Sequence, residues 1–257
     1  RELGQVMTNT SEQIPEESTF VQKTPSVMRF PERLVGIIFY PAKVFESIRE
    51  NPVILGPICA LILMGIVQVP IMAPYNNQMI ESQIRSVNPE ATQEQIEKAK
   101  QLAGSTTSLV IGTVAIVFVV PLFMVIFSGM YWTIFTVTMG TGASFRSIFS
   151  VVGHSQLISI IGAIVYASLT VIQDETVISL HLGNLVPFLE SDDLIYLVLK
   201  RIDIFTGWWL CLLSIGFGIL FRMKTTTAAI VPFSLWALWI IVEVAAADFL
   251  GKFIPGF

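Results

Sequence analysis

The stretch VILGPICALILMGIVQVPIMAP, residues 53–74, contains no charged residue and is long enough to cross a lipid bilayer. A helix rises about 1.5 Å per residue, so about 20 residues cover the roughly 30 Å of hydrocarbon in a membrane. The whole chain has a matching composition, because 53% of its 257 residues are hydrophobic and only 13% are charged. A soluble domain carries about a quarter charged residues. The sequence therefore predicts an all-α integral membrane protein.

Four further apolar segments predict a total of five transmembrane helices. The predicted spans are residues 53–74, 107–138, 147–172, 204–221 and 227–247. The second span is longer than a perpendicular crossing needs, so we expect a tilted helix with a kink at Pro121. Residues 75–105 are polar and rich in helix formers, which predicts a helical hairpin in water on the outward side of the membrane.

The distribution of basic residues predicts the orientation of these spans. Nine of the fifteen Lys and Arg residues lie in the N-terminal segment and in the turns at 139–146 and 222–225. Cytoplasmic loops are enriched in Lys and Arg, so we expect these segments, and the N-terminus, on the cytoplasmic side. Residues 1–28 are polar, have no apolar segment typical of a signal peptide, and are expected to form a disordered tail.

A short polar segment, PAKVFESIRENP at 41–52, precedes the first span and is bounded by prolines. Three apolar residues share one helical face, and charged residues occupy most of the remaining surface. Such a helix suits the membrane interface. We expect interfacial helices over residues 31–50, on the cytoplasmic side, where a partner docks. The residues that carry this prediction are Pro41, Val44, Phe45, Ile48 and Pro52.

Several motifs follow this segment in a fixed order. They are GTGASF at 140–145, IDIFTGW at 202–208, LSIGFG at 213–218 and KTTT at 224–227. With the proline-bounded segment, they make the chain similar to the prokaryotic branch of the Yip (Ypt-interacting protein) family over residues 31–245. That family often has a proline a few residues into its third span, whereas residues 154–160 (HSQLISI) include none.

The resemblance implies a five-span helical protein of the bacterial cytoplasmic membrane with a cytoplasmic N-terminus. Eukaryotic relatives bind small GTPases and act in vesicle traffic, and some prokaryotic relatives accompany ABC-type export or toxin-protection systems. The resemblance thus implies a non-enzymatic scaffold or accessory protein. Its partners would be membrane lipids and a membrane complex such as an ABC-type exporter, or a small GTPase; homo-oligomerisation is left open.

Four polar residues in or beside the spans are candidates for function. A charge in hydrocarbon is costly and usually marks a pathway or a partner, which singles out Glu243, unless it is solvated at the outer interface near Asp248. His154 and Gln156, at the start of the third span, suit either a proton relay or a structural interfacial role. Asp203 suits a helix cap or a binding role. An alternative function is therefore transport of a small solute, ion or lipid with Glu243 and His154.

Catalytic and metal-binding motifs are absent from the sequence. It has no GxSxG, HExxH, P-loop or GxGxxG pattern, so we expect no enzymatic activity, no cofactor and no metal. Both cysteines lie in apolar runs and are expected to pack as small residues. The acidic group of Glu190, Asp192 and Asp193 lacks EF-hand spacing and is interpreted as solvated. No basic cluster interleaved with aromatic residues indicates nucleic-acid binding.

Overall fold

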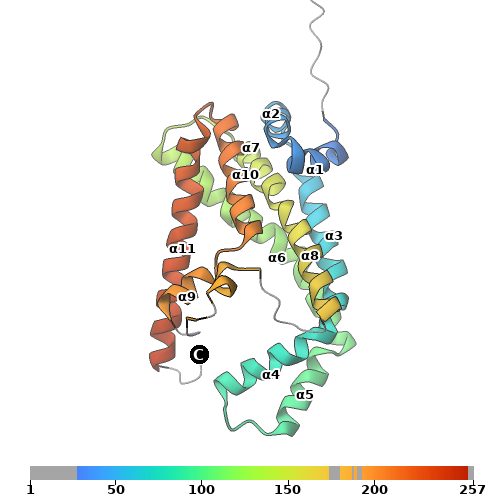
Figure 1. The fold of residues 1–257 in the computed structure, drawn as a ribbon. Helices are drawn as coiled ribbons and strands as arrows, with labels where there is room; N and C mark the ends of the chain where they lie inside the picture. Colours follow the sequence, from blue (N-terminus) through green and yellow to red (C-terminus); the bar gives the residue numbers. More distant parts are fainter. Residues whose placement is uncertain (1–27, 174–179, 187, 190–192, 254–257) are drawn as a thin grey trace, which may run out of the picture.

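The computed structural model describes residues 28–173, 180–186, 188–189 and 193–253. Within these ranges the chain is all-helical and has no strand, as the composition predicts (Figure 1). The tail predicted for residues 1–28 lies outside the described residues, except for Met28. Glu190 and Asp192 of the acidic group also lie outside them.

Four segments of the described chain are long and apolar enough to cross a membrane. They are Leu55–Tyr75, Thr106–Thr138, Phe145–Ile172 and Thr225–Ala246. The span predicted for residues 204–221 corresponds to α10 (Ile204–Leu220), an apolar helix of 17 residues that is shorter than these four. Length and composition thus support four spanning helices.

The spanning segments are built from long helices with short irregular turns of helix at their ends. They are α3 (Leu55–Met72), η1 (Ala73–Tyr75), α6 (Thr106–Trp132), the π-helical η2 (Thr133–Thr138), α7 (Phe145–Gln156), α8 (Ile158–Gln173) and α11 (Thr225–Phe253). The uncharged segment predicted as one long helix forms α6 and η2 without a break, and Pro121 lies inside α6. Figure 1 shows α6 running obliquely behind the other helices.

The core is built around α10, which contacts α7, α8, α11 and the helix over residues 41–50. An aromatic cluster lies at its C-terminal end. The ring centroid of Phe217 is 4.9 Å from that of Tyr131 and 4.8 Å from that of Phe135. The Phe135 ring also lies 4.5 Å from that of Phe221. Because aromatic rings bury large apolar areas, this cluster fixes α10 against the end of α6 and η2.

The helices α1 (Phe30–Phe39) and α2 (Pro41–Glu50) cover this end of the core (Figure 1). Val44, Phe45 and Ile48 were predicted to face the membrane interface or a partner, but all three are at most 1% exposed and belong to the protein core. Phe45 is buried because α10 has a glycine, Gly216, opposite its ring. A Cβ added at Gly216 would lie only 2.9 Å from the Phe45 ring, so the ring occupies the space that a side chain would fill. The apolar face of α2 is therefore covered by protein.

Two further helices, α4 (Asn76–Val87) and α5 (Gln93–Ala103), form a pair at the opposite end of the molecule (Figure 1). This pair occupies the region predicted as a helical hairpin. The carboxylate of Glu81 accepts hydrogen bonds from Lys100 Nζ at 2.8 Å and Arg85 Nη2 at 3.0 Å. The short η3 (Leu182–Leu185) and α9 (Leu194–Leu199) precede α10 along the chain. Charged side chains thus hold the α4–α5 pair together at its surface.

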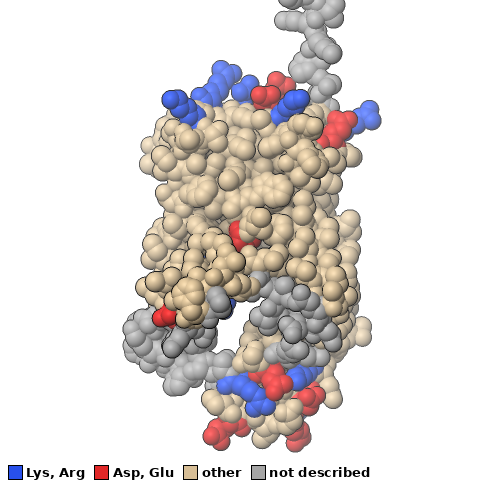
Figure 2. All heavy atoms as spheres, in the orientation of Figure 1, with Lys and Arg blue, Asp and Glu red and all other residues tan. Residues whose placement is uncertain are grey.

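Basic side chains gather at the end of the molecule that α1 and α2 cover (Figure 2). Those exposed on this end and in its turns are Arg29, Lys43, Arg49, Arg146, Arg222 and Lys224. The band below this end is almost free of charged residues on the face shown. This distribution is the one expected for a membrane protein whose basic end meets the headgroups of one leaflet.

Candidate functional site

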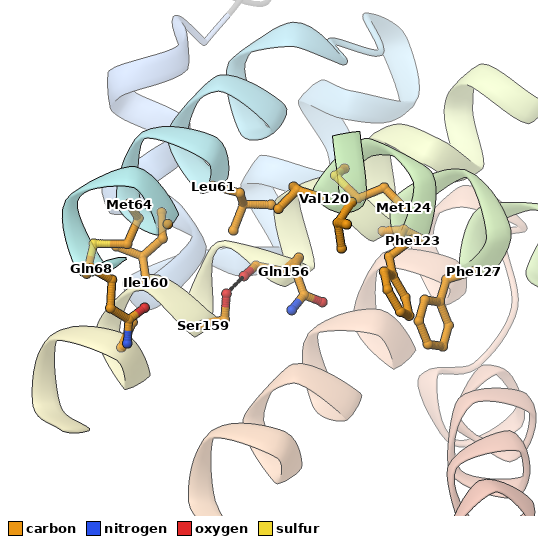
Figure 3. Close-up of a pocket in the computed structure, with 14 residues that line it drawn as sticks. Leu61, Met64, Gln68, Val120, Phe123, Met124, Phe127, Gln156, Ser159 and Ile160 are labelled. Atoms are coloured by element: carbon orange, nitrogen blue, oxygen red, sulfur yellow. Dashed lines mark hydrogen bonds between the residues drawn. The ribbon is translucent and has the colours of Figure 1, made fainter. Parts of the chain in front are cut away.

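A pocket of about 350 Å³ lies between α3, α6 and the α7–α8 pair (Figure 3). Its fourteen lining residues include eleven apolar residues and three polar ones, and none is charged. The polar residues are Gln68 from α3, Gln156 from the end of α7 and Ser159 from α8. The pocket is thus an apolar space in which a few uncharged hydrogen-bonding groups are concentrated.

The polar side of the pocket is formed where α7 gives way to α8. The two helices are separated at Leu157, although the chain has no proline there. The hydroxyl of Ser159 donates to the backbone oxygen of Gln156 at 2.8 Å and so satisfies a carbonyl left free by the break. Neither the Gln68 carboxamide nor the Gln156 carboxamide has a hydrogen-bond partner within the described part of the chain. Both amides are therefore available to a molecule in the pocket.

A second polar arrangement joins α1 to α2 and is centred on Arg33, which is completely buried. Its guanidinium donates to the backbone oxygens of Met28 at 3.1 Å and Asn51 at 3.2 Å, and to Ser47 Oγ at 2.9 Å. Ser47 and Asn51 lie at the C-terminal end of α2, where free carbonyls attract a cation. Burial lowers the pKa of Arg33 from its ordinary value because water no longer solvates the charge. Arg33 therefore fixes the angle between the two helices.

The candidate His154 lies next to this junction and away from the pocket. Its side chain is fully buried, its Nδ1 lies 2.8 Å from the backbone oxygen of Ser150, and its ring meets the Phe30 ring edge-on at 6.2 Å. Within the described residues its Nε2 has no hydrogen-bond partner. The neighbouring residue Gln156, by contrast, lines the pocket. The two candidates from the third span thus lie in different environments.

The Yip1 domain matches residues 35–246, which is most of the chain. The chain belongs to the Yip1 family. The membrane protein YknW of Bacillus subtilis (strain 168) is 27% identical over 205 residues, covering 77% of this chain and 82% of that protein. No solved structure matches.

Within the Yip1 domain, Glu243 and Asp203 have structural partners. Glu243 Oε1 lies 2.7 Å from Arg201 Nη2, and both side chains are partly exposed, at 33% and 43%. Asp203 is the N-cap of α10, since its Oδ1 accepts from the backbone N–H groups of Phe205 at 2.8 Å and Thr206 at 3.0 Å. Glu243 is thus neutralised by an ion pair, and Asp203 satisfies free donors at a helix start.

The Yip1 domain does not bring its polar candidates together. His154 contacts α1 at the basic end, whereas Glu243 pairs with a residue that follows α9. No group of three His, Cys, Asp or Glu side chains that could hold a metal ion occurs in the described part of the chain. The residues that sequence reasoning missed are Arg33 and Gln68. Gln68 had a usable signal, because it is the one strongly polar side chain in residues 53–74.

Proposed function

We propose that this Yip1-family protein is a non-enzymatic accessory or scaffold protein of the bacterial cytoplasmic membrane. It binds a partner membrane complex, such as an ABC-type exporter, through the exposed, charged face of α2. A small GTPase is the alternative partner. Family membership supports a membrane accessory role. The name of the Bacillus relative supports a place in a membrane.

The topology that goes with this role has five spans and a cytoplasmic N-terminus. α10 serves as the additional span, because its 17 residues, most of them apolar, extend over about 26 Å, close to the hydrocarbon thickness of a membrane. The concentration of basic residues around α1 and α2 supports the cytoplasmic placement of that end (Figure 2). The two helices then lie at the cytoplasmic surface as amphipathic elements.

The observation that carries the proposal is the rigid presentation of the charged face of α2. Its apolar face is locked into the core, and the Arg33 guanidinium holds its C-terminal end. The opposite face exposes Lys43, Glu46 and Glu50. A helix that needed only to anchor the chain in lipid would direct its apolar face outward. A rigid helix with exposed charges of both signs is suited to recognising a complementary protein surface.

The transport alternative has less support. It requires Glu243 and His154 along one pathway, whereas the first is engaged by Arg201 and the second is enclosed beside α1. At the basic end, aromatic rings also fill the space between α10 and the end of α6. The accessory role therefore agrees better with the placement of the polar residues.

The proposal is tested by affinity purification of the full chain from native membranes, followed by quantitative mass spectrometry. A triple variant, Lys43→Glu with Glu46→Lys and Glu50→Lys, reverses the exposed charges of α2. The matched control, Glu90→Lys with Glu94→Lys and Lys98→Glu, makes the same net change on exposed positions in and beside α5. We expect the partner to be recovered with the wild type and the control and lost with the α2 variant. Equal recovery with the α2 variant would overturn the proposal.

A further inference from the structure

We propose that the pocket between α3, α6 and the α7–α8 pair binds one hydrocarbon chain of an uncharged lipid that carries an ester, amide or hydroxyl group. This inference concerns a different surface from α2 and does not depend on the accessory role.

The lining predicts a ligand that is mostly apolar, uncharged, and able to form a few hydrogen bonds. The carboxamides of Gln68 and Gln156 each offer donors and acceptors, and neither has a partner in the described part of the chain. An amide without a partner is costly in a membrane because no water reaches it. Charged ligands are disfavoured, since no charged side chain lines the pocket. An ester, amide or hydroxyl group would satisfy the two amides.

The opening of the pocket points to entry from the hydrocarbon. Two residues of its α6 wall, Val119 and Phe123, remain 43% and 54% exposed and continue into the exposed apolar surface of that helix. That surface includes Phe118 and Leu122, which are also exposed. In a membrane this surface faces lipid, so a lipid chain can reach the pocket sideways.

The size of the pocket excludes a partner helix and accommodates a single chain. A helix with its side chains is about 10 Å across, too wide for a space of about 350 Å³. That volume lies within the roughly 300–1,000 Å³ typical of small-molecule sites. The flexible side chains of Met64 and Met124 line the pocket and can adjust to a chain of irregular path. Figure 3 shows the Phe123 and Phe127 rings on the side away from Gln68, where they form an apolar end.

The depth of the pocket in the membrane favours a neutral lipid over a charged phospholipid. Gln68 is 13 residues after Leu55, which places it about 20 Å along α3 and so well inside a hydrocarbon layer of about 30 Å. A charged headgroup cannot follow its ester to this depth without a large desolvation cost. An uncharged lipid such as a monoacylglycerol can do so.

The test uses the purified full chain in phosphatidylcholine nanodiscs and a monoacylglycerol that carries a diazirine in its acyl chain. After illumination, labelled peptides are mapped by mass spectrometry, with unlabelled monoacylglycerol as competitor. We expect saturable labelling concentrated at residues 61–68 and 119–127. A phosphatidylglycerol with the same diazirine chain should compete at least about ten-fold less well, the factor that corresponds to roughly one lost interaction.

Two variants decide whether the labelling comes from the pocket. Ala163→Phe fills it and should lower saturable labelling about ten-fold, whereas the matched control Ile164→Phe lies on the adjacent, 52% exposed position and should leave it unchanged. The double variant Gln68→Leu with Gln156→Leu keeps the volume and should lower labelling about five-fold by removing the hydrogen bonds. If Ala163→Phe does not fold, the double variant decides alone. Even labelling along α6, undiminished labelling of folded Ala163→Phe or of the double variant, or equal competition by phosphatidylglycerol would each overturn the proposal.

Discussion

The two ends of the molecule are stabilised by different interactions. At the basic end, α1 and α2 cover a continuous core in which Phe45, Phe135 and Phe217 are at most 1% exposed. At the opposite end, the α4–α5 pair buries little beyond Ile96 among its described side chains and is joined by ion pairs of Glu81. Burying one large apolar side chain contributes about 1.5–3 kcal/mol, whereas an exposed ion pair contributes about 0–1 kcal/mol.

This difference indicates where the molecule is rigid and where it opens easily. Local opening has a low free energy where few apolar contacts are buried. The α4–α5 pair should therefore have a lower free energy of opening than the basic end. A docking surface on α2 rests on the rigid end and is already organised before a partner binds. Substitutions should therefore have large effects at the basic end and small effects in α4–α5.

The largest effect is expected from Phe45→Asp. This change removes a buried ring beside Gly216 and places a carboxylate in an apolar site. We expect a loss of at least about 4 kcal/mol in the free energy of unfolding, seen as failure to accumulate in membranes or as early thermal unfolding in detergent. Glu46→Ala changes the neighbouring exposed position and should stay within about 0.5 kcal/mol. Wild-type stability of Phe45→Asp would contradict the buried placement of α2.

The orientation of α2 also shows what the sequence could not predict. Periodicity placed Val44, Phe45 and Ile48 on one face, and this grouping is correct. It could not tell whether lipid or protein covers that face, because both are apolar. The deciding feature is Gly216 on α10, which is about 170 residues away along the chain, and a long-range contact of this kind has no local signal.

Arg33 and Gln68 illustrate two other limits. Arg is almost never fully buried, and only the meeting of α1 with the end of α2 supplies the acceptors that bury Arg33. Gln68 lies alone in an apolar run, and only the packing of α3 against α6, α7 and α8 places it beside Gln156 in the pocket. By contrast, the Asp203 cap and the all-helical, membrane-spanning character follow from local spacing and composition, which is why they could be predicted.

The next largest effect is expected from Arg33→Ala. The change leaves the buried carbonyls at the end of α2 without a donor, and each hydrogen bond to a charged group contributes about 1.5–3 kcal/mol. We expect a loss of about 3 kcal/mol, measured by thermal unfolding of the purified chain. Arg33→Lys should lose part of this, because an ammonium cannot reproduce the guanidinium fork. Arg29→Ala is the control at an exposed position; an equal loss there would mean that charge at this end matters more than the buried contacts.

A smaller loss is expected from Gly216→Ala. The added Cβ would lie 2.6 Å from Val151 Cγ1 and 2.9 Å from Phe45 Cε1. Such overpacking costs about 1–3 kcal/mol, so the midpoint of thermal unfolding should fall. Gly129→Ala in α6 is the matched control, because no heavy atom lies within 4 Å of the added Cβ there. It should not destabilise the protein, because the added methyl group meets open space. Equal behaviour of the two variants would argue against close approach of α2 and α10.

The smallest effect concerns the pH dependence of the α4–α5 pair. Hydrogen bonds from Lys100 and Arg85 hold the pKa of Glu81 below its ordinary value of 4.5, and the bond to Glu81 raises the pKa of Lys100 above 10.5. The stabilising contribution of Glu81 is therefore fully present above pH 4.5 and is lost as the pH falls through the lowered pKa. That of Lys100 is present below pH 10.5 and is lost only as the pH rises through the raised pKa.

Hydrogen–deuterium exchange, corrected for the intrinsic effect of pH, measures this contribution locally. On acidification below pH 4.5, protection should fall in the α4–α5 peptides and stay unchanged in α2 and α10, since surface ion pairs act locally. Glu81→Gln should lower protection at neutral pH and remove the acid dependence, because it mimics the protonated carboxyl. Glu90→Gln, at an exposed position in the turn, should do neither. If acid loosened α2 as much as α4–α5, the two ends would be one cooperative unit, and the contrast between a core-stabilised end and an ion-paired end would not hold.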